Sequence, residues 1–377
     1  MSASDSQKKS KGREWAPRIW EGCSFPSWVR LLLRNRAAVH LPHWYIAAIV
    51  SFVSMNQSVL GFFDEMFFRH RVHRTKIRHD PLFILGHWRS GTTLLHELLI
   101  LDQRHSFPNT YQCLEPNHFL LTESVLSQVM GVLLPSRRPM DNMAAGFDRP
   151  QEDEFAMCLL GAPSPYLTIA FPNHAPAFPE YLDMESISPQ ARRQWQRTFY
   201  RFVQRISCKN PKRLVLKSPP HTARIPILLE MFPKAKFVHI VRDPAVVFPS
   251  TVNMWKSMYK KHGLQTPTHA GLEDHVLESF ERMYRRFEAT QHLVPADQFH
   301  ELKYEDLIRD PIAEMKKIYE QLQLGGYDEA LPAIRAYFEK TRDYSTNKYT
   351  MDEKQQEAVR RRWVPLMQRY GYGAKVD

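Results

Sequence analysis

The feature that most constrains the fold is a short apolar run followed directly by a loop bounded by glycines. Residues 81–85 are a proline and four large apolar residues, and the loop continues from Gly86 to Thr93. An apolar run of this length between Pro and Gly is typical of a strand buried on both faces of a parallel sheet. The leucine-rich segment Leu94–Ile100 then predicts a helix. Strand, loop and helix in this order predict a site where backbone N–H groups bind a phosphate-like anion.

Three further strands are predicted, each ahead of a helix. They lie at Leu214–Lys217, Lys236–Arg242 and Phe299–Tyr304, ahead of helices predicted at 222–231, 244–259 and from Pro311. Because strands that alternate with helices favour a parallel sheet covered on both faces, the predicted fold class is α/β. Residues 113–210 are rich in Pro and predict helices and loops that build the acceptor side.

Residues 1–80 are the most basic part of the chain. They hold 13 Lys and Arg against 6 Asp and Glu, so they carry +7 of the formal charge of +11. We expect a polar tail at 1–14 and a helical extension at 15–80, ahead of a catalytic domain at 81–377. Residues 37–63 have no charged side chain and are long enough to span a bilayer. A buried accessory helix, an interfacial membrane helix and a membrane span all stay open.

Composition and cysteine spacing bound the environment. With 43% hydrophobic and 24% charged residues the chain lies in the ordinary globular range. The four cysteines are far apart and include no CxxC pair, which indicates neither a zinc site nor a disulfide framework. Residues 1–20 lack the apolar core of a secretory signal. We therefore expect a cytoplasmic protein, with peripheral membrane contact through residues 15–80 left open.

The loop departs at one position from the loops that bind nucleoside triphosphates. Those loops place Lys after the second glycine, where it reaches the β and γ phosphates, whereas this chain has Thr92 there. Gly86 and Gly91 permit a tight turn, and the N–H groups that open the next helix favour an anion. Arg89 supplies a cation inside the loop, and Thr92 and Thr93 add hydroxyl donors. The loop thus predicts a single phosphate that carries one transferable group.

This loop resembles the 5′-phosphosulfate loop of PAPS-dependent sulfotransferases, in the form found in tyrosylprotein and carbohydrate enzymes, with Trp88 in place of a proline. PAPS is 3′-phosphoadenosine-5′-phosphosulfate, and PAP is the nucleotide left after transfer. The resemblance implies a three-layer, P-loop-like α/β fold and sulfuryl transfer from PAPS to a hydroxyl or amine, with release of PAP and no required metal. The residues implied to bind the cofactor are Arg89, Ser90, Gly91, Thr92 and Thr93.

PAPS carries a 3′-phosphate, so a second anion site is required. Arg242 ends a predicted strand and Ser250 follows eight residues later, the spacing of the family's 3′-phosphate motif. A guanidinium and a hydroxyl can donate to one phosphate; an ion pair between Arg242 and Asp243 is the alternative. Tyr304 resembles a family tyrosine that approaches the nucleotide. The basic segment 342–349 departs from that of cytosolic aryl sulfotransferases, which favours the bacterial-type branch.

Two catalytic roles remain. Lys217 ends a predicted strand and resembles the lysine of tyrosylprotein sulfotransferases that stabilises charge on the leaving phosphate. The general base is assigned to Glu115 on its resemblance to a glutamate that follows the loop in related enzymes. A carboxylate or a histidine can act as this base, so other candidates stay open. They are Glu152, Asp153, Glu154, His118 and His221.

Two other functions are compatible with parts of the pattern. A P-loop kinase shares the fold and the loop frame, but it needs a phosphate-reaching Lys and metal-binding acids. A basic protein that binds a membrane surface or nucleic acid would explain residues 1–80, but it has no need of two phosphate motifs. We therefore expect PAPS and PAP as partners and no nucleic acid. Carbohydrate, lipid, phenol and peptide tyrosine stay open as acceptors, as does the oligomeric state.

Overall fold

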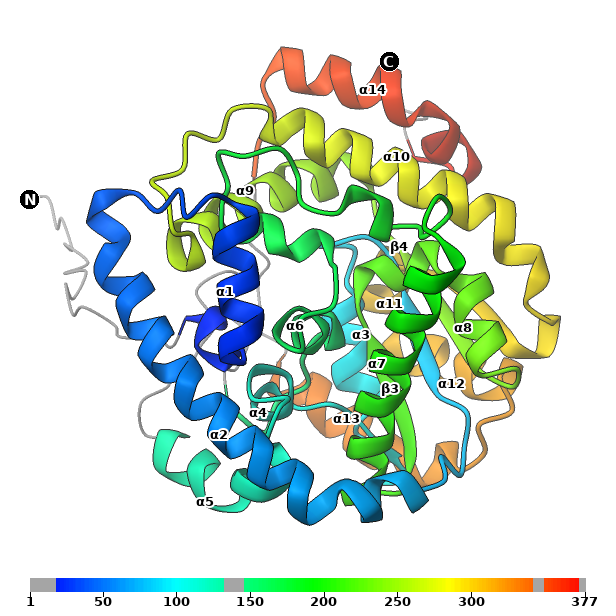
Figure 1. Ribbon diagram of the computed structural model, residues 1–377. Helices are drawn as coiled ribbons and strands as arrows, with labels where there is room; N and C mark the ends of the chain where they lie inside the picture. Colours follow the sequence, from blue (N-terminus) through cyan, green and yellow to red (C-terminus); the bar gives the residue numbers. More distant parts are fainter. Residues whose placement is uncertain (1–17, 132–145, 342–348, 373–377) are drawn as a thin grey trace, which may run out of the picture.

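A sheet of five parallel strands lies at the centre of the computed structural model, which describes residues 18–131, 146–341 and 349–372 (Figure 1). The strand order is β2-β3-β1-β4-β5, and every neighbouring pair is parallel. The strands are β1 (Leu82–Leu85), β2 (His105–Ser106), β3 (Arg213–Lys217), β4 (Lys236–Val241) and β5 (Phe299–Lys303). This arrangement confirms the predicted α/β fold.

Helices cover both faces of the sheet. The N-terminal and central helices are α1 (Phe25–Arg34), α2 (Trp44–Arg74), α3 (Thr92–Leu99), α4 (Thr110–Leu114), α5 (Phe119–Gly131), α6 (Asp153–Leu159), α7 (Pro189–Lys209) and α8 (Ile225–Met231). The later ones are α9 (Pro244–His262), α10 (Leu272–Thr290), α11 (Tyr304–Arg309), α12 (Pro311–Gln321), α13 (Tyr327–Lys340) and α14 (Glu353–Arg369). Short 3-10 helices include η1 (Ile19–Gly22), η2 (Leu41–His43), η3 (Pro165–Ile169), η4 (Pro179–Tyr181) and η5 (Pro219–Ala223), with η6 (Gln291–Leu293) and η7 (Ala296–Gln298) before β5.

Alternate strand residues face two separate hydrophobic cores. Phe83 of β1 packs in the larger core, to which α7, α9, α10 and α14 contribute. Ile84, the next residue, packs in the smaller core with residues of α3, α12 and α13. Because both faces of β1 are covered, all its side chains are buried and the strand is apolar throughout. The three layers of the predicted architecture follow from this.

The strand register places three chain segments at one edge of the sheet. Ile84 pairs with Lys217, so the end of β1 and the end of β3 lie side by side. On the other side Leu85 pairs with His239, two residues before β4 ends. In a parallel α/β sheet ligands bind outside the carboxyl ends of the strands. The loop after β1 therefore lies between the segments that follow β3 and β4.

Some boundaries differ from the predictions. The helix predicted at 222–231 is divided into η5 and α8, because Pro226 has no N–H to donate to the Thr222 carbonyl, as one continuous helix would require. The helix predicted from Pro311 is preceded by a short one, α11. Strand β2 has two residues, too few to show a hydrophobic period. The helices and loops expected at 113–210 are confirmed in the described residues.

The extension predicted at 15–80 is helical from residue 19, as expected. Trp20, Trp28 and Val50 are buried in the same hydrophobic core as Phe83. The expected tail at 1–14 lies outside the described residues. The division of the chain at residue 80 stays a prediction.

Candidate functional site

The loop after β1 makes a tight turn that brings backbone N–H groups to the edge of the sheet. Arg89 has φ 68° and Gly91 has φ 102°. Both the N–H and the hydroxyl of Ser90 donate to the His87 carbonyl, at 3.2 and 2.8 Å. A Cβ at Gly91 would lie 2.4 Å from the Tyr304 ring, so only glycine permits this approach. The turn therefore delivers the chain to α3 with its first N–H groups at the sheet edge.

The start of α3 is suited to an anion. Gly91 is its N-cap, and no side chain of the described residues caps the first turn. Uncapped N–H groups at a helix start bind phosphate and sulfate groups well. Thr92, which is buried, and Thr93 open the helix, two residues before the predicted start at Leu94. These residues could hold one phosphate of a nucleotide.

A second group of donors lies beside this loop. The Arg89 Nε donates to the Ser250 hydroxyl of α9 at 2.9 Å, and Arg242 donates to the Arg89 carbonyl at 3.3 Å. The Arg242 guanidinium also lies over the Tyr304 ring, 4.1 Å from its centroid. Asp243 caps α9 by accepting the Ala245 N–H at 2.8 Å. The structure therefore brings together four predicted cofactor residues, and Asp243 has a different role from the proposed ion pair.

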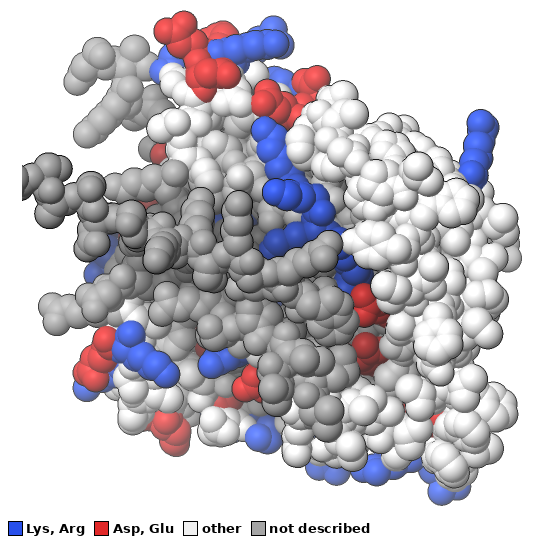
Figure 2. Space-filling view, turned by 90° about the vertical axis from the view of Figure 1, so that its left-hand side faces the viewer, with Lys and Arg blue, Asp and Glu red and all other residues white. Residues whose placement is uncertain are grey.

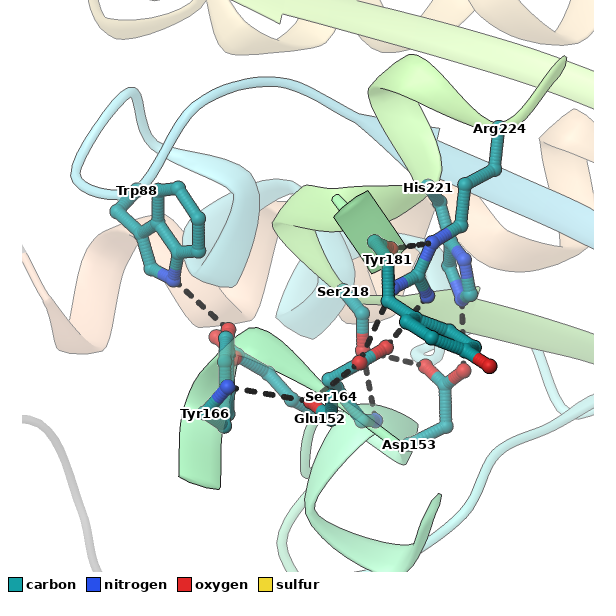
Figure 3. A network of polar contacts seen from close by, with 10 residues as sticks. Trp88, Glu152, Asp153, Ser164, Tyr166, Tyr181, Ser218, His221 and Arg224 are labelled. Atoms are coloured by element: carbon teal, nitrogen blue, oxygen red, sulfur yellow. Dashed lines mark hydrogen bonds and ion pairs between the residues drawn. The ribbon is translucent and has the colours of Figure 1, made fainter. Parts of the chain in front are cut away.

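Lys217 forms an ion pair with Glu152 at the end of β3. Its Nζ lies 2.8 Å from Glu152 Oε1, and the Lys217 side chain is buried. The other carboxylate oxygen accepts the Tyr166 hydroxyl at 2.5 Å, and the Trp88 indole donates to Tyr166 at 2.7 Å (Figure 3). Burial raises the pKa of Tyr166 well above its ordinary value, and Glu152 raises it further. The phenol therefore keeps its proton and donates to Glu152.

The two acids after Glu152 pair inside the protein (Figure 3). Asp153 accepts the Ser218 hydroxyl at 2.7 Å and lies 2.6 Å from His221 Nε2. Burial alone would raise the pKa of Asp153. The charge of His221 and the hydrogen bonds to Asp153 have the larger effect, so the pKa of this carboxyl lies below its ordinary value. Glu154 forms a buried ion pair with Arg224 at 2.6 Å. These pairs fix the start of α6 against η5, and Glu152 is the one acid of the three that keeps partial exposure.

Glu115 lies apart from this group, at the end of α4. Its carboxylate is 3.2 Å from His118 Nε2, and His118 also contacts Gln57 of α2. Burial raises the pKa of Cys23 to about 12, and the nearby Glu115 carboxylate adds to the effect. No hydrogen bond or ion pair between described residues joins Glu115 to Lys217 or to the loop.

The structure adds residues that the sequence did not single out. Tyr166 contacts Glu152, Ser218 contacts Asp153 and Glu154, and Arg224 contacts Glu154. Trp88, which donates to Tyr166, had been noted only as a substitution for proline. The sequence offered one usable signal for this network. Trp88, whose indole N–H can donate a hydrogen bond, stands where related loops have a proline, which has no donor. Arg342 and Lys348, at the expected basic segment, lie outside the described residues.

Fold and site define an α/β protein with hydrogen-bond donors suited to anions at the carboxyl edge of a parallel sheet. A model of the sulfotransferase family matches residues 81–329. The chain is 48% identical over 367 residues to proteins of Mycobacterium bovis and Mycobacterium tuberculosis named omega-hydroxy-beta-dihydromenaquinone-9 sulfotransferase Stf3, covering 97% of this chain and 94% of each relative. The chain therefore belongs to the sulfotransferase family, and it is a sulfotransferase.

Two solved structures share the fold. The sulfotransferase STF9 of Mycobacterium avium aligns with a TM-score of 0.63 and 17% identity, over 93% of this chain and 97% of that one. STF1 of Mycobacterium tuberculosis aligns with a TM-score of 0.59 and 17% identity, over 92% and 93%. These matches confirm the predicted fold and, with the family match, the sulfotransferase interpretation over the kinase and the non-enzymatic alternatives.

Proposed function

We propose that the enzyme transfers a sulfuryl group from PAPS to the terminal hydroxyl of a menaquinone-type lipid. The acceptor class follows the name of the mycobacterial relatives, which cover nearly the whole chain. The donor rests on the convergence of Arg89, Arg242 and Ser250 beside the loop, since two anion sites suit a nucleotide with a 3′-phosphate. A cytoplasmic location, where unpaired thiols persist, belongs to the same proposal.

The donor groups at the sheet edge fit PAPS. The loop residues Ser90, Gly91, Thr92 and Thr93 with the start of α3 would hold the 5′-phosphosulfate. Arg242 and Ser250 would hold the 3′-phosphate, with Arg89 between the two sites and Tyr304 beside the nucleotide. When bound, PAPS supplies a sulfuryl group attached to a phosphate leaving group.

Lys217 and Glu152 would divide the chemistry between them. Glu152 takes the proton of the acceptor hydroxyl as its oxygen forms the new bond to sulfur. Lys217 stabilises the negative charge that grows on the departing phosphate oxygen as the old S–O bond breaks. Tyr166 holds the carboxylate in place through its hydrogen bond of 2.5 Å. We prefer Glu152 to Glu115 because Glu152 contacts Lys217, while Glu115 stays the competing candidate.

Ligand-induced thermal stabilisation tests the donor. A ligand that binds only the folded state stabilises it by about 2.7 kcal/mol at a hundredfold excess over its Kd. We expect PAP to raise the melting temperature and ATP with Mg²⁺ to change it little. Stabilisation by ATP with Mg²⁺ and none by PAP would contradict the proposal.

A further inference from the structure

Helix α2 has an inverted distribution of polar and apolar residues. Its inward face is partly polar, with Ser54, Gln57 and Asp64 buried against the protein. Asp64 accepts the Leu121 N–H at 3.0 Å and pairs with Arg205 at 2.8 Å. A helix on the surface of a protein in water normally has the opposite arrangement. Because polar residues of α2 face the protein, the opposite face of the helix is suited to an apolar environment.

The outward face of α2 is apolar and mostly aromatic. Its most exposed side chains include Phe52 at 70%, Phe62 at 66% and Phe67 at 62%. The other exposed large apolar residues of the segment are Leu41, Trp44, Tyr45, Ile49, Met55, Val59, Phe63 and Met66. At about 100° per residue, this set occupies an arc of roughly 140° from Leu41 to Phe67, and the exposed Asn56 is a polar residue within that arc. A largely apolar face of this kind marks an interaction site.

We propose that this outward face of α2 is a docking surface for an anionic lipid bilayer, with the helix lying in the plane of the interface. The inference rests on the proposed function for its biological purpose, since a lipid acceptor resides in a membrane.

Helix α2 lies along the protein rather than projecting from it (Figure 1). The Trp28 indole donates to Ser51 at 2.9 Å, and the Phe25 N–H donates to Ser58 at 2.8 Å. Near the other end, Arg71 donates to the Cys208 carbonyl at 3.3 Å. The segment Leu41–Arg74 is long and apolar enough to cross a membrane by length and composition. Because these contacts hold it on the domain from end to end, an in-plane position suits it better than a span.

The two ends of α2 carry the groups that interfacial helices use. Trp44 and Tyr45 open the helix, where amphipathic rings favour the headgroup region. The last turns and the residues after them are basic, with Arg69, Arg71, Arg74, Lys76 and Arg78. Basic residues beside an apolar face strengthen binding to anionic lipids. In Figure 2 a broad face without charged residues lies on the right of the view, and Lys and Arg border it below.

Vesicle flotation of the full-length protein tests the surface. The vesicles contain phosphatidylcholine with a minor fraction of phosphatidylglycerol, and neither PAPS nor acceptor is added. We expect the wild type to float with the vesicles. F52Q/F62Q should lower the partition coefficient at least tenfold, since two large apolar side chains lose their contact with the bilayer. Glutamine is a good helix former, so the helix itself should be kept.

The matched control replaces two apolar residues exposed elsewhere. Leu293 and Ile308 are each 48% exposed, and L293Q/I308Q should float like the wild type. V59Q/M66Q, on the same face of α2, repeats the test should F52Q/F62Q not fold. Wild-type protein that stays in the aqueous fraction overturns the proposal, as does equal flotation of the α2 variants.

Two more outcomes separate this surface from other accounts. The wild type could instead be a dimer that does not bind vesicles, while the F52Q/F62Q variant is a monomer. That result would make the face a contact between two copies and would overturn the bilayer proposal. The protein could also bind vesicles through α2 and yet transfer no sulfuryl group to a menaquinone-type lipid. That result supports the docking surface and contradicts the proposed acceptor.

Discussion

The Lys217 ammonium lies 2.8 Å from the Glu152 carboxylate, although 65 residues separate the two in the sequence. The contact joins the end of β3 to the residue that directly precedes α6. It places a cation and a carboxylate next to the loop that would hold the donor. Sulfuryl transfer is aided by a group that stabilises the leaving phosphate and by a proton acceptor, and Lys217 and Glu152 are suited to these two roles.

Replacing Glu152 by Gln should lower kcat by about 10² to 10⁴, because the acceptor hydroxyl loses its base. PAP affinity should stay within about threefold of wild type, since the nucleotide contacts are elsewhere. Steady-state kinetics with calorimetric PAP binding measure both quantities. Glu115→Gln is the matched comparison and should keep a near-normal rate. If Glu115→Gln is the slow variant and Glu152→Gln is not, the base is Glu115.

Replacing Lys217 by Met should reduce turnover by about 10² to 10³ while PAP still binds. Met keeps the unbranched shape of the side chain and removes the charge. Because Glu152 then loses its ion-pair partner, the melting temperature of the variant should be recorded with the kinetics. Wild-type turnover in an assay limited by chemistry would refute the role of Lys217.

Replacing Arg242 by Ala should weaken PAP binding about 10- to 100-fold, in line with the loss of hydrogen bonds to a charged group. Binding of adenosine 5′-phosphate, which lacks the 3′-phosphate, should change little. Ser250→Ala should show the same selectivity to a smaller extent. A similar loss for both nucleotides would mean that Arg242 does not recognise the 3′-phosphate.

His87 should make the protein less stable in acid. Its ring lies among Trp88, Phe280 and Trp363, and burial lowers its pKa from 6.5 to about 3. Between these values the unfolded chain binds a proton that the folded chain does not, so stability falls as pH falls from 6.5. The slope is up to about 1.4 kcal/mol per pH unit. Urea unfolding across this window should show a shallower slope in His87→Asn, and an unchanged slope would contradict the assignment.

The parts of the site that sequence could predict are those encoded locally. The loop Gly86–Thr93 follows an apolar strand and opens a helix, and Arg242 directly follows β4 while Ser250 lies on the next helix, α9. Lys217 was found in the same way, at a strand end. Each of these depends on a few neighbouring residues, so periodicity located the strands and helices, and the resemblance to sulfotransferase motifs assigned the roles.

The choice of base could not be made that way. Glu152, Asp153 and Glu154 are consecutive and chemically alike, and their basic partners Lys217, His221 and Arg224 lie more than 60 residues away in the chain. Tertiary packing alone separates the partly exposed carboxylate from the two buried ones.

The orientation of α2 on the protein could not be predicted from the sequence either. Its apolar residues extend round much of the helix, and burial of Ser54 and Asp64 shows which side faces the protein.

The most direct test of the central claim is transfer of ³⁵S-labelled sulfate from PAPS to a menaquinone derivative with a terminal hydroxyl. We predict that label appears in the lipid, that PAP forms in equal amount, and that Glu152→Gln and Lys217→Met lose the product while they still bind PAP. If the enzyme binds PAP but forms no labelled lipid, the proposal that the acceptor is a menaquinone-type lipid is contradicted. Undiminished transfer by both variants would contradict the proposed roles of Lys217 and Glu152.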